Sequence, residues 1–140
     1  RLLDATLMLQ LEVAERLAAP PGSKTYGVLS IQARLDAETS VLLELPPGAF
    51  RPRPEVRSAL VRLRFRPSPV APRNRAGLDR LLHALFSQRR KTTANALKPL
   101  ARRLGLDERR VLESAGVEGT RRPETLDLAE LVAIADQLIG

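Results

Sequence analysis

The chain has 140 residues, with 23 Lys and Arg against 16 Asp and Glu, and a formal net charge of +7. It has no cysteine and a single histidine, so the composition excludes disulfides, thiolate metal sites and a histidine cluster for zinc. No apolar run approaches the roughly 20 residues of a membrane-spanning helix, and the length is sufficient to bury a core. We therefore expect a globular protein whose partners include neither a membrane nor a metal.

Two helices are predicted at the start of the chain. Leucines that recur every three or four residues predict an amphipathic helix over residues 3–18, which Pro20 would end. A second, shorter helix is predicted over residues 28–35. Between them, Tyr26 next to Gly27 marks a turn, and we assign no chemistry to it.

Two strands are predicted after these helices. Residues 39–45 contain a continuous apolar stretch, typical of a strand that is covered on both faces. Apolar and polar side chains alternate in residues 56–65, which predicts a strand with one buried face. An antiparallel pair results if residues 46–55 connect the two. Because two strands alone are marginally stable, we expect a larger sheet or helices to cover them.

Prolines divide the chain into two parts. Residues 67–74 are predicted to form an extended, proline-rich linker, because proline excludes helix locally and restricts the residue before it. Residues 1–66 then form an α/β part, and residues 75–140 form a small all-helical domain.

The first two helices after the linker follow from apolar spacing. One is predicted over residues 78–88, with His83 on its solvated side. The next begins with Thr92 or Thr93 as its N-cap. Pro99 is expected to kink or restart this helix, because it lacks a donor and clashes with the preceding turn.

The last two helices are predicted from their caps. Gly105 is well placed to end the preceding helix in a left-handed conformation. Asp107 then caps a short helix over residues 107–114. Asp127 and Glu130 have the spacing of a capping box for the final helix.

Charge is distributed unevenly along the chain. Residues 51–103 carry 15 basic and 2 acidic side chains, a balance of +13, whereas residues 1–50 and 104–140 have balances of −2 and −4. A basic middle between acidic flanks favours a polyanionic partner, with counterion release as the driving force. A solvated arginine-rich surface is the alternative.

Three consecutive cations, Arg89, Arg90 and Lys91, stand at the end of one predicted helix, directly before the cap of the next. Such cations attract phosphates, and the N-terminus of the following helix would add free N–H donors for an anion. Runs of three cations also occur on solvated faces, so the residues alone leave both interpretations open.

Two further loops carry candidate RNA-binding residues. In the first, prolines stiffen the backbone around Phe50, which stands beside Arg51 and Arg53, an arrangement suited to stacking on an unpaired base. The alternative is that Phe50 fills the core at the end of a strand. The second loop offers Arg121 and Arg122, although a structural turn is the alternative there.

Motifs for binding a nucleotide are absent from the sequence. No Gly-x-Gly-x-Gly follows a predicted strand and no Walker loop exists, so the chain has no nucleotide cradle of its own. The acidic residues are scattered without an obvious catalytic pair.

Six short segments match the motifs of one protein family. They occur in the same order as in that family, and the match covers essentially the whole chain. They are residues 10–17 and 21–27, 45–50 and 56–63, and 86–92 and 122–126. Together they resemble the bacterial 16S ribosomal RNA adenine dimethyltransferases associated with kasugamycin sensitivity. The first pair is similar to that family's helix and turn after the catalytic motif. The second is similar to its proline loop and final strand, and the third to its carboxy-terminal helical domain.

The resemblance implies a cytoplasmic protein with a Rossmann-like methyltransferase domain. Family members bind S-adenosylmethionine through a Gly-rich loop and an acidic residue, and hold the target adenine at an Asn-Leu/Ile-Pro-Tyr/Phe motif. None of these segments occurs in the sequence. The chain, which opens at Arg1, is therefore expected to be the carboxy-terminal half of such an enzyme. It would lack catalytic and cofactor-binding residues of its own, and only the full-length parent would bind the cofactor.

The resemblance also assigns roles to residues. It places Phe50 near the flipped adenine and matches Arg89, Arg90 and Lys91 to the family's cationic run linked to rRNA binding. The chain departs from the family at four positions where a basic residue is usual. Leu11 and Glu55 stand where the family often has Lys, and Val28 and Ala94 stand where it often has Arg.

We therefore expect a carboxy-terminal fragment of an S-adenosylmethionine-dependent 16S rRNA adenine N6,N6-dimethyltransferase of small-subunit ribosome biogenesis. Its partners would be 16S rRNA and the small ribosomal subunit. The first alternative is a stand-alone, non-enzymatic nucleic-acid-binding helical module, which has no reason to carry a buried strand pair and an aromatic proline loop. The second is a structural interaction protein, which would show no salt-dependent binding of nucleic acid.

Overall fold

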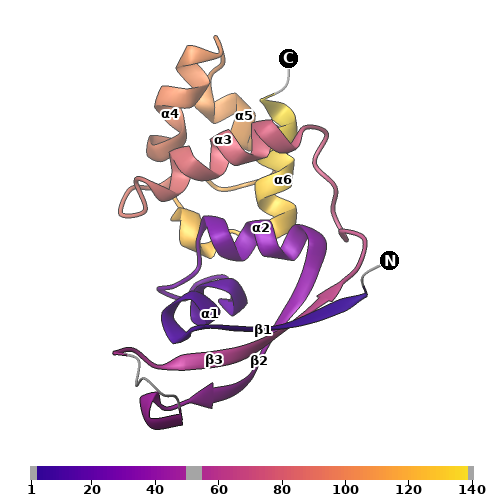
Figure 1. Ribbon diagram of the computed structural model, residues 1–140. Coiled ribbons are helices and arrows are strands. Elements are labelled where there is room, and N and C mark those ends of the chain that lie inside the picture. The colour runs from indigo at the N-terminus through magenta and orange to yellow at the C-terminus, as the bar shows by residue number, and fades with distance from the viewer. Residues whose placement is uncertain (1–2, 50–54, 139–140) are drawn as a thin grey trace.

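A computed structural model of the chain describes residues 3–49 and 55–138. Figure 1 shows a three-stranded sheet at one end, helices α3 to α6 gathered at the other, and α2 between them. In chain order the elements are β1 (Asp4–Gln10), α1 (Leu11–Ala18), α2 (Val28–Asp36), β2 (Ala37–Leu45), the 3-10 turn η1 (Pro47–Ala49), β3 (Ser58–Phe65), α3 (Arg75–Phe86), α4 (Thr93–Arg103), α5 (Glu108–Ala115), the 3-10 turn η2 (Pro123–Thr125) and α6 (Leu128–Gln137).

β3 is the middle strand of the described sheet, whose order is β1-β3-β2 with both pairs antiparallel. The predicted antiparallel pairing of residues 39–45 with residues 56–65 is confirmed, and a third strand joins it. The register places Asp4 opposite Arg64 and Gln10 opposite Ser58 in one pair, and Ala37 opposite Phe65 and Leu45 opposite Ser58 in the other.

The helix predicted over residues 3–18 is wrong in its first half, which forms β1. The leucines at positions 3, 7 and 11 fit a helical spacing, but they also lie on the odd positions of an alternating strand. Pairing with β3 decides between the two, since the Phe65 N–H donates to the Leu3 carbonyl at one end of β1 and the Leu11 N–H donates to the Arg57 carbonyl at the other. Only residues 11–18 form the helix, α1.

The expectation that residues 39–45 are covered on both faces is also wrong for the described part of the chain. Three neighbouring side chains of β2, those of Val41, Leu42 and Leu43, are 39–53% exposed. β2 lies at an edge of the described sheet, and its apolar side chains lack the cover that their sequence predicts.

The predicted helices of the second part are present, with the predicted caps. The side chains of Thr92 and Asp107 accept the N-terminal bonds of α4 and α5, and Asp127 forms a capping box with Glu130 at α6. Of the two outcomes expected for Pro99, the restart is wrong, because α4 is one uninterrupted helix that contains it, and the kink stays a prediction. Pro99 is exposed, so water can solvate the carbonyl group whose helical donor the proline removes.

Two clusters of buried side chains form the core. The small one lies between α1 and β3 and consists of Ala14, Ala59 and Val61, with Leu9, Leu11 and Leu63 against them. The large one joins α2 to the four following helices and includes Tyr26, Ile31, Leu35, Leu78, Leu81, Leu82, Leu85, Leu97, Leu131 and Ile134. Helix α2 therefore packs into the same core as α3 to α6.

Residues 67–74 contain neither helix nor strand. Hydrogen bonds connect the parts before and after this segment. The Arg75 guanidinium at the start of α3 donates to both carboxylate oxygens of Asp36 in α2 at 2.7 and 3.1 Å, and the Arg73 N–H within the segment donates to Asp136 of α6 at 3.0 Å. The hydrogen bonds from Arg75 hold the pKa of Asp36 below its ordinary value. The division into residues 1–66 and 75–140 remains a prediction.

Candidate nucleic-acid interface

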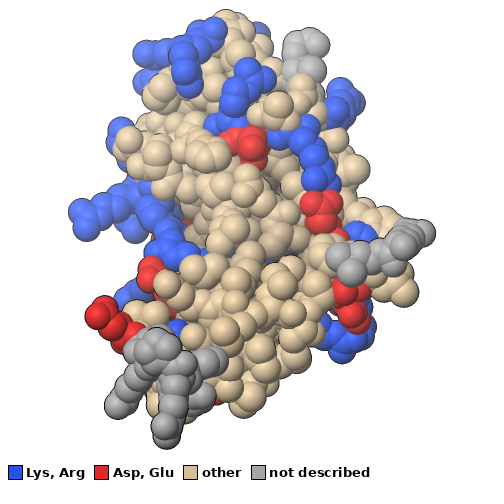
Figure 2. Space-filling view, in the orientation of Figure 1, with Lys and Arg blue, Asp and Glu red and all other residues tan. Residues whose placement is uncertain are grey.

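The turn between α3 and α4 presents the cationic run. Helix α3 ends at Phe86, residues 87–92 turn the chain, and the Thr92 side chain accepts the Asn95 N–H at the start of α4. On the face seen in Figure 2, Lys and Arg side chains gather over α4 and at the height of this turn, and acidic side chains are sparse there. This turn is therefore the centre of the candidate interface.

The expectation that the N-terminus of α4 offers free N–H donors to an anion is wrong. The N–H groups of Thr93 and Ala94 donate to the carbonyls of Arg121 and Gly119, at 2.7 and 3.0 Å. Thr93, which is buried, adds a bond from its hydroxyl to the same Arg121 carbonyl. The loop before η2 thus occupies the donors that a phosphate would need.

Arg89 turns inward from the run. Its Nη2 donates to the Tyr26 carbonyl at 2.6 Å, and its guanidinium lies 5.8 Å from the centre of the Phe86 ring. The same nitrogen lies 4.0 Å from a carboxylate oxygen of Glu124. Arg89 thereby ties the turn to the segment before α2 and to η2, and its charge is partly engaged within the chain.

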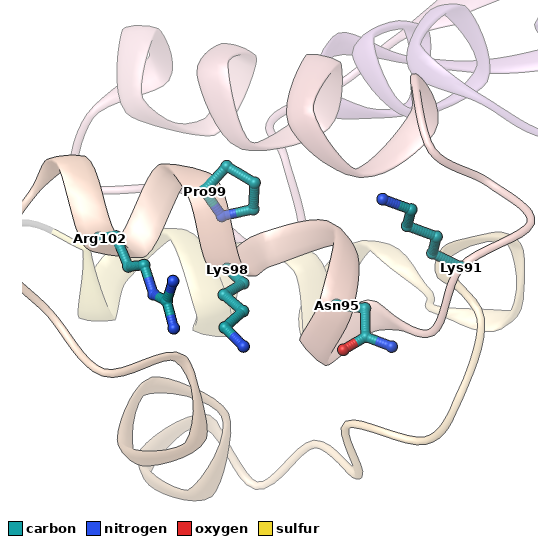
Figure 3. Close-up of a pocket in the computed structure, with 5 residues that line it drawn as sticks. All are labelled: Lys91, Asn95, Lys98, Pro99 and Arg102. Carbon is teal, nitrogen blue, oxygen red and sulfur yellow. The ribbon is translucent and has the colours of Figure 1, made fainter.

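Arg90 and Lys91 turn outward and are exposed. Lys91 lines an open depression of about 460 Å³ together with four residues of α4, namely Asn95, Lys98, Pro99 and Arg102. In Figure 3 the side chains of Asn95, Lys98 and Arg102 project from one side of the helix, and Lys91 lies on the turn before it. The structure thus brings Lys91 together with cations that sequence reasoning did not single out.

Of the two cations in the loop before α6, one is engaged within the chain and the other is exposed. Arg121 pairs with both carboxylate oxygens of Glu130 and donates to the Thr125 carbonyl at 2.7 Å. These hydrogen bonds lower the pKa of Glu130 and raise that of Arg121 from their ordinary values. Arg122 is exposed beside them.

Tyr26, whose sequence context indicates no chemistry, is fully buried and joins three segments. Its hydroxyl donates to the Leu126 carbonyl at 2.7 Å, and its ring meets Phe86 edge-on at 6.0 Å between centroids. The Arg34 guanidinium lies 5.5 Å from the centre of the tyrosine ring. Burial raises the pKa of Tyr26 to about 12. Its position in a short Pro-Gly turn gave no sign of this role.

Phe50, Arg51 and Arg53 lie outside the described residues. Directly after them, Glu55, Val56 and Arg57 line a depression of about 400 Å³ whose other wall comes from β1 and α1 and includes Glu12 and Glu15. This lining carries three glutamates and one arginine, and Arg16 pairs with Glu12 at 3.0 Å, so the depression attracts phosphate less than the turn before α4 does.

The described residues do not fit S-adenosylmethionine. A Gly-rich loop between a strand and a helix would be needed, yet β1 passes directly from Gln10 into α1, and β3 reaches α3 through the proline-rich residues 66–74. Within residues 3–49 and 55–138, no cluster of His, Cys, Asp and Glu has the arrangement of a metal site. No helix of the same residues has the length and apolar character required to cross a membrane.

Comparisons with known proteins agree over nearly the whole chain. The family model described as ribosomal RNA adenine dimethylase matches residues 2–134. Ribosomal RNA small subunit methyltransferase A of Dinoroseobacter shibae is 47% identical over 95% of this chain and 46% of its own length. The protein of the same name from Pseudomonas aeruginosa is 46% identical over 96% of this chain and 48% of its own length. The chain thus spans about half the length of these relatives.

Two solved structures resemble the fold. A dimethyladenosine transferase from Plasmodium falciparum superposes with a TM-score of 0.82 at 25% identity, covering 94% of this chain and 55% of that one. The 23S rRNA methyltransferase ErmE superposes with a TM-score of 0.61 at 22% identity, covering 97% and 55%. The second likeness concerns the fold alone.

Proposed function

The chain belongs to the ribosomal RNA adenine dimethylase family, and from this membership we propose that it is the carboxy-terminal half of a 16S rRNA adenine N6,N6-dimethyltransferase. The family uses S-adenosylmethionine as its methyl donor. In this proposal the cofactor and the catalytic motif belong to the other half of the parent protein. The described chain contributes docking on 16S rRNA, in the cytoplasmic assembly of the small ribosomal subunit.

The exposed sheet supports the proposal that this is one half of a Rossmann-like domain. Large apolar side chains on both outer strands are open to solvent, with Leu7 and Met8 on β1 42% and 55% exposed and Leu42 and Leu43 on β2 each 53% exposed. Such a sheet margin is typical of a surface that further structure covers. The amino-terminal half of the parent would supply that cover.

The observation that carries the docking role is the concentration of positive charge around the turn before α4. Arg90 and Lys91 are exposed there, and the sequence contains no Asp or Glu from residue 80 to residue 106. Arg122 is a further exposed candidate, whereas Arg89 and Arg121 support the interface by holding the turn and the loop before α6. Cations that are not neutralised by neighbouring acids release counterions from a phosphate backbone when they bind.

A methyl group reaches an adenine amino group only when that base leaves its stack. We assign Phe50 to the pocket for the unstacked base, with Arg51 and Arg53 on the adjacent backbone, on the strength of the family pattern. Glu12, Glu15 and Glu55, which line the depression directly after these residues in the sequence, support this division, since carboxylates accept hydrogen bonds from base amino groups and repel phosphates. Docking by the helices and binding of the base would then involve different residues of the chain.

The stand-alone nucleic-acid-binding module explains the helices but not the sheet. A module built on α3 to α6 needs neither a three-stranded sheet with exposed apolar side chains nor the packing of α2 into the helical core. The family membership leaves this alternative without support of its own.

The proposal is tested by fluorescence anisotropy of the 140-residue chain with a hairpin from the 3′ end of 16S rRNA and with a random DNA duplex. We expect tighter binding of the RNA hairpin, strong salt dependence, and a loss of roughly tenfold in the Arg90→Gln/Lys91→Gln double variant. Preference for the DNA duplex would contradict the proposal in favour of the module. Calorimetry with S-adenosylmethionine is expected to give no heat of binding, and measurable heat would overturn the assignment to the carboxy-terminal half.

A further inference from the structure

One side of α4 carries a row of polar and cationic side chains. Asn95, Lys98 and Arg102 recur at the three-to-four spacing that brings side chains to one face of a helix, and Lys91 of the preceding turn lines the same depression. We call these four residues the α4 row. Only Lys91 belongs to the cationic run of the family pattern.

The charge of the α4 row is not neutralised within the described chain. No ion pair formed by Lys91, Lys98 or Arg102 occurs among residues 3–49 and 55–138. Residues 80–106 contain seven Lys and Arg and no acidic residue, so the neighbouring sequence supplies no carboxylate either. Three cations along one open depression therefore favour an extended polyanion over a small ligand.

The α4 row lacks the side chains that hold unpaired nucleotides. Proteins that bind single strands stack bases on aromatic rings, and the depression is lined by Lys91, Asn95, Lys98, Pro99 and Arg102 alone. The aromatic ring of the neighbouring helix, Phe86, packs edge-on against Tyr26 with Arg89 over it, so that ring already has partners on two sides. The row thus offers charge and hydrogen bonds without a stacking platform.

We propose that the α4 row binds the sugar–phosphate backbone of a double-stranded RNA segment. Lys91, Lys98 and Arg102 contact phosphates, and the Asn95 amide, which both donates and accepts, bonds a 2′-hydroxyl exposed in the shallow groove of A-form RNA. These contacts position the duplex without reading its sequence. The proposal rests on the proposed function and extends it, because it names a paired RNA segment, distinct from the unpaired target base, as the partner of the helical part.

Arg103 provides a matched control for Arg102. Both are exposed arginines at the end of α4, but successive helical residues point about 100° apart. Arg103 lines a different depression, together with Asp79, Arg80 and His83. Arg102→Gln and Arg103→Gln therefore remove the same charge from adjacent positions, and Lys98→Gln gives an independent second variant of the row.

The experiment measures binding of the chain to a blunt RNA hairpin and to an unstructured RNA strand of equal length over a series of salt concentrations. For the hairpin we expect Arg102→Gln and Lys98→Gln each to weaken binding roughly fivefold and to reduce the slope of log affinity against log salt by about 0.9, with Arg103→Gln close to wild type. Equal losses in Arg102→Gln and Arg103→Gln would overturn the α4 row while leaving the proposed function intact. Equal losses on the single strand would overturn the assignment to duplex RNA, and a wild-type chain that binds neither RNA would overturn the proposed function as well.

Discussion

Arg89 and Arg90 are neighbours with the same side chain, yet they have different roles. The guanidinium of Arg89 is held by the Tyr26 carbonyl and lies over Phe86, whereas Arg90 is exposed. A hydrogen bond from a charged donor contributes more to stability than a neutral one, and an exposed cation contributes little. The cationic run therefore combines a residue that holds the turn with exposed cations, which we propose as RNA contacts.

Arg89→Ala is expected to lower the free energy of unfolding by about 2 kcal/mol, because it leaves the Tyr26 carbonyl without its charged donor. Arg90→Ala should change it by less than about 0.5 kcal/mol, as is usual for exposed positions. Chemical denaturation of both variants measures the difference. Equal stabilities, together with an equal loss of RNA affinity, would show that Arg89 contacts RNA directly.

Tyr26 offers a spectroscopic test of its buried position. The chain has one tyrosine and no tryptophan, so the absorbance change of tyrosine ionisation reports this residue alone. Because burial raises the pKa of Tyr26 to about 12, the native chain should ionise about two pH units above the unfolded chain, whose tyrosine titrates near pH 10.

The raised pKa of Tyr26 also makes the free energy of unfolding depend on pH. A folded-state pKa above the unfolded value favours folding below about pH 10, and this contribution is lost as the pH rises through about 12. Unfolding by urea at a series of alkaline pH values should show the loss, and Tyr26→Phe should remove it. A native titration near pH 10 would contradict the buried, hydrogen-bonded phenol.

At the scale of elements, the strand β1 could not be predicted from its own residues. Its leucines satisfy a helical and an alternating spacing equally well, and only β3, more than 40 residues later, selects the strand. The caps of α4, α5 and α6 were predictable because each depends on residues within one turn. The blocked N-terminus of α4 was not, since its donors are taken by carbonyls of a loop about 25 residues away.

Helix α4 contains a proline in its interior. Pro99 is exposed and removes one backbone hydrogen bond of this uninterrupted helix. Pro99→Ala restores the donor and is expected to raise the free energy of unfolding by about 2 kcal/mol, within the difference between proline and alanine in helix interiors. Thermal unfolding followed by circular dichroism measures the gain, and an unchanged or lower midpoint would contradict it.

The pair of Arg121 and Glu130 joins the loop before α6 to the helix itself. Hydrogen bonds from Arg121 lower the pKa of Glu130, so the ionised carboxylate favours the folded state. That contribution is present above the unfolded-state pKa of about 4.3 and is lost as the pH falls through the lower folded-state pKa. Glu130→Gln should therefore be less stable than wild type at neutral pH, with the difference narrowing in acid.

Urea unfolding of wild type and Glu130→Gln at neutral pH and at about pH 3 measures this difference. Asp79→Asn serves as a control, because Asp79 is an exposed carboxylate on a different helix, α3, and does not contact Arg121. A difference between wild type and Glu130→Gln that is independent of pH would show that the pair acts through shape and not through charge.

The molecule has an apolar surface at the end formed by the sheet and a cationic surface at the end formed by the helices. Exposed apolar side chains lie on the sheet, and cations that lack acidic neighbours lie along α4 and the turn before it. The family and the cationic run were predictable from short motifs such as residues 86–92. The α4 row was not, because Asn95, Lys98 and Arg102 form no motif until the helix brings them to one side.

Hydroxyl-radical footprinting of 16S rRNA in small ribosomal subunits, with the 140-residue chain bound, tests whether the turn before α4 docks on ribosomal RNA. We predict protected backbone on paired segments near the target adenines at the 3′ end, and loss of that protection in Arg90→Gln/Lys91→Gln at equal protein concentration. Protection scattered over the subunit, or protection that persists unchanged in the double variant, would contradict this prediction.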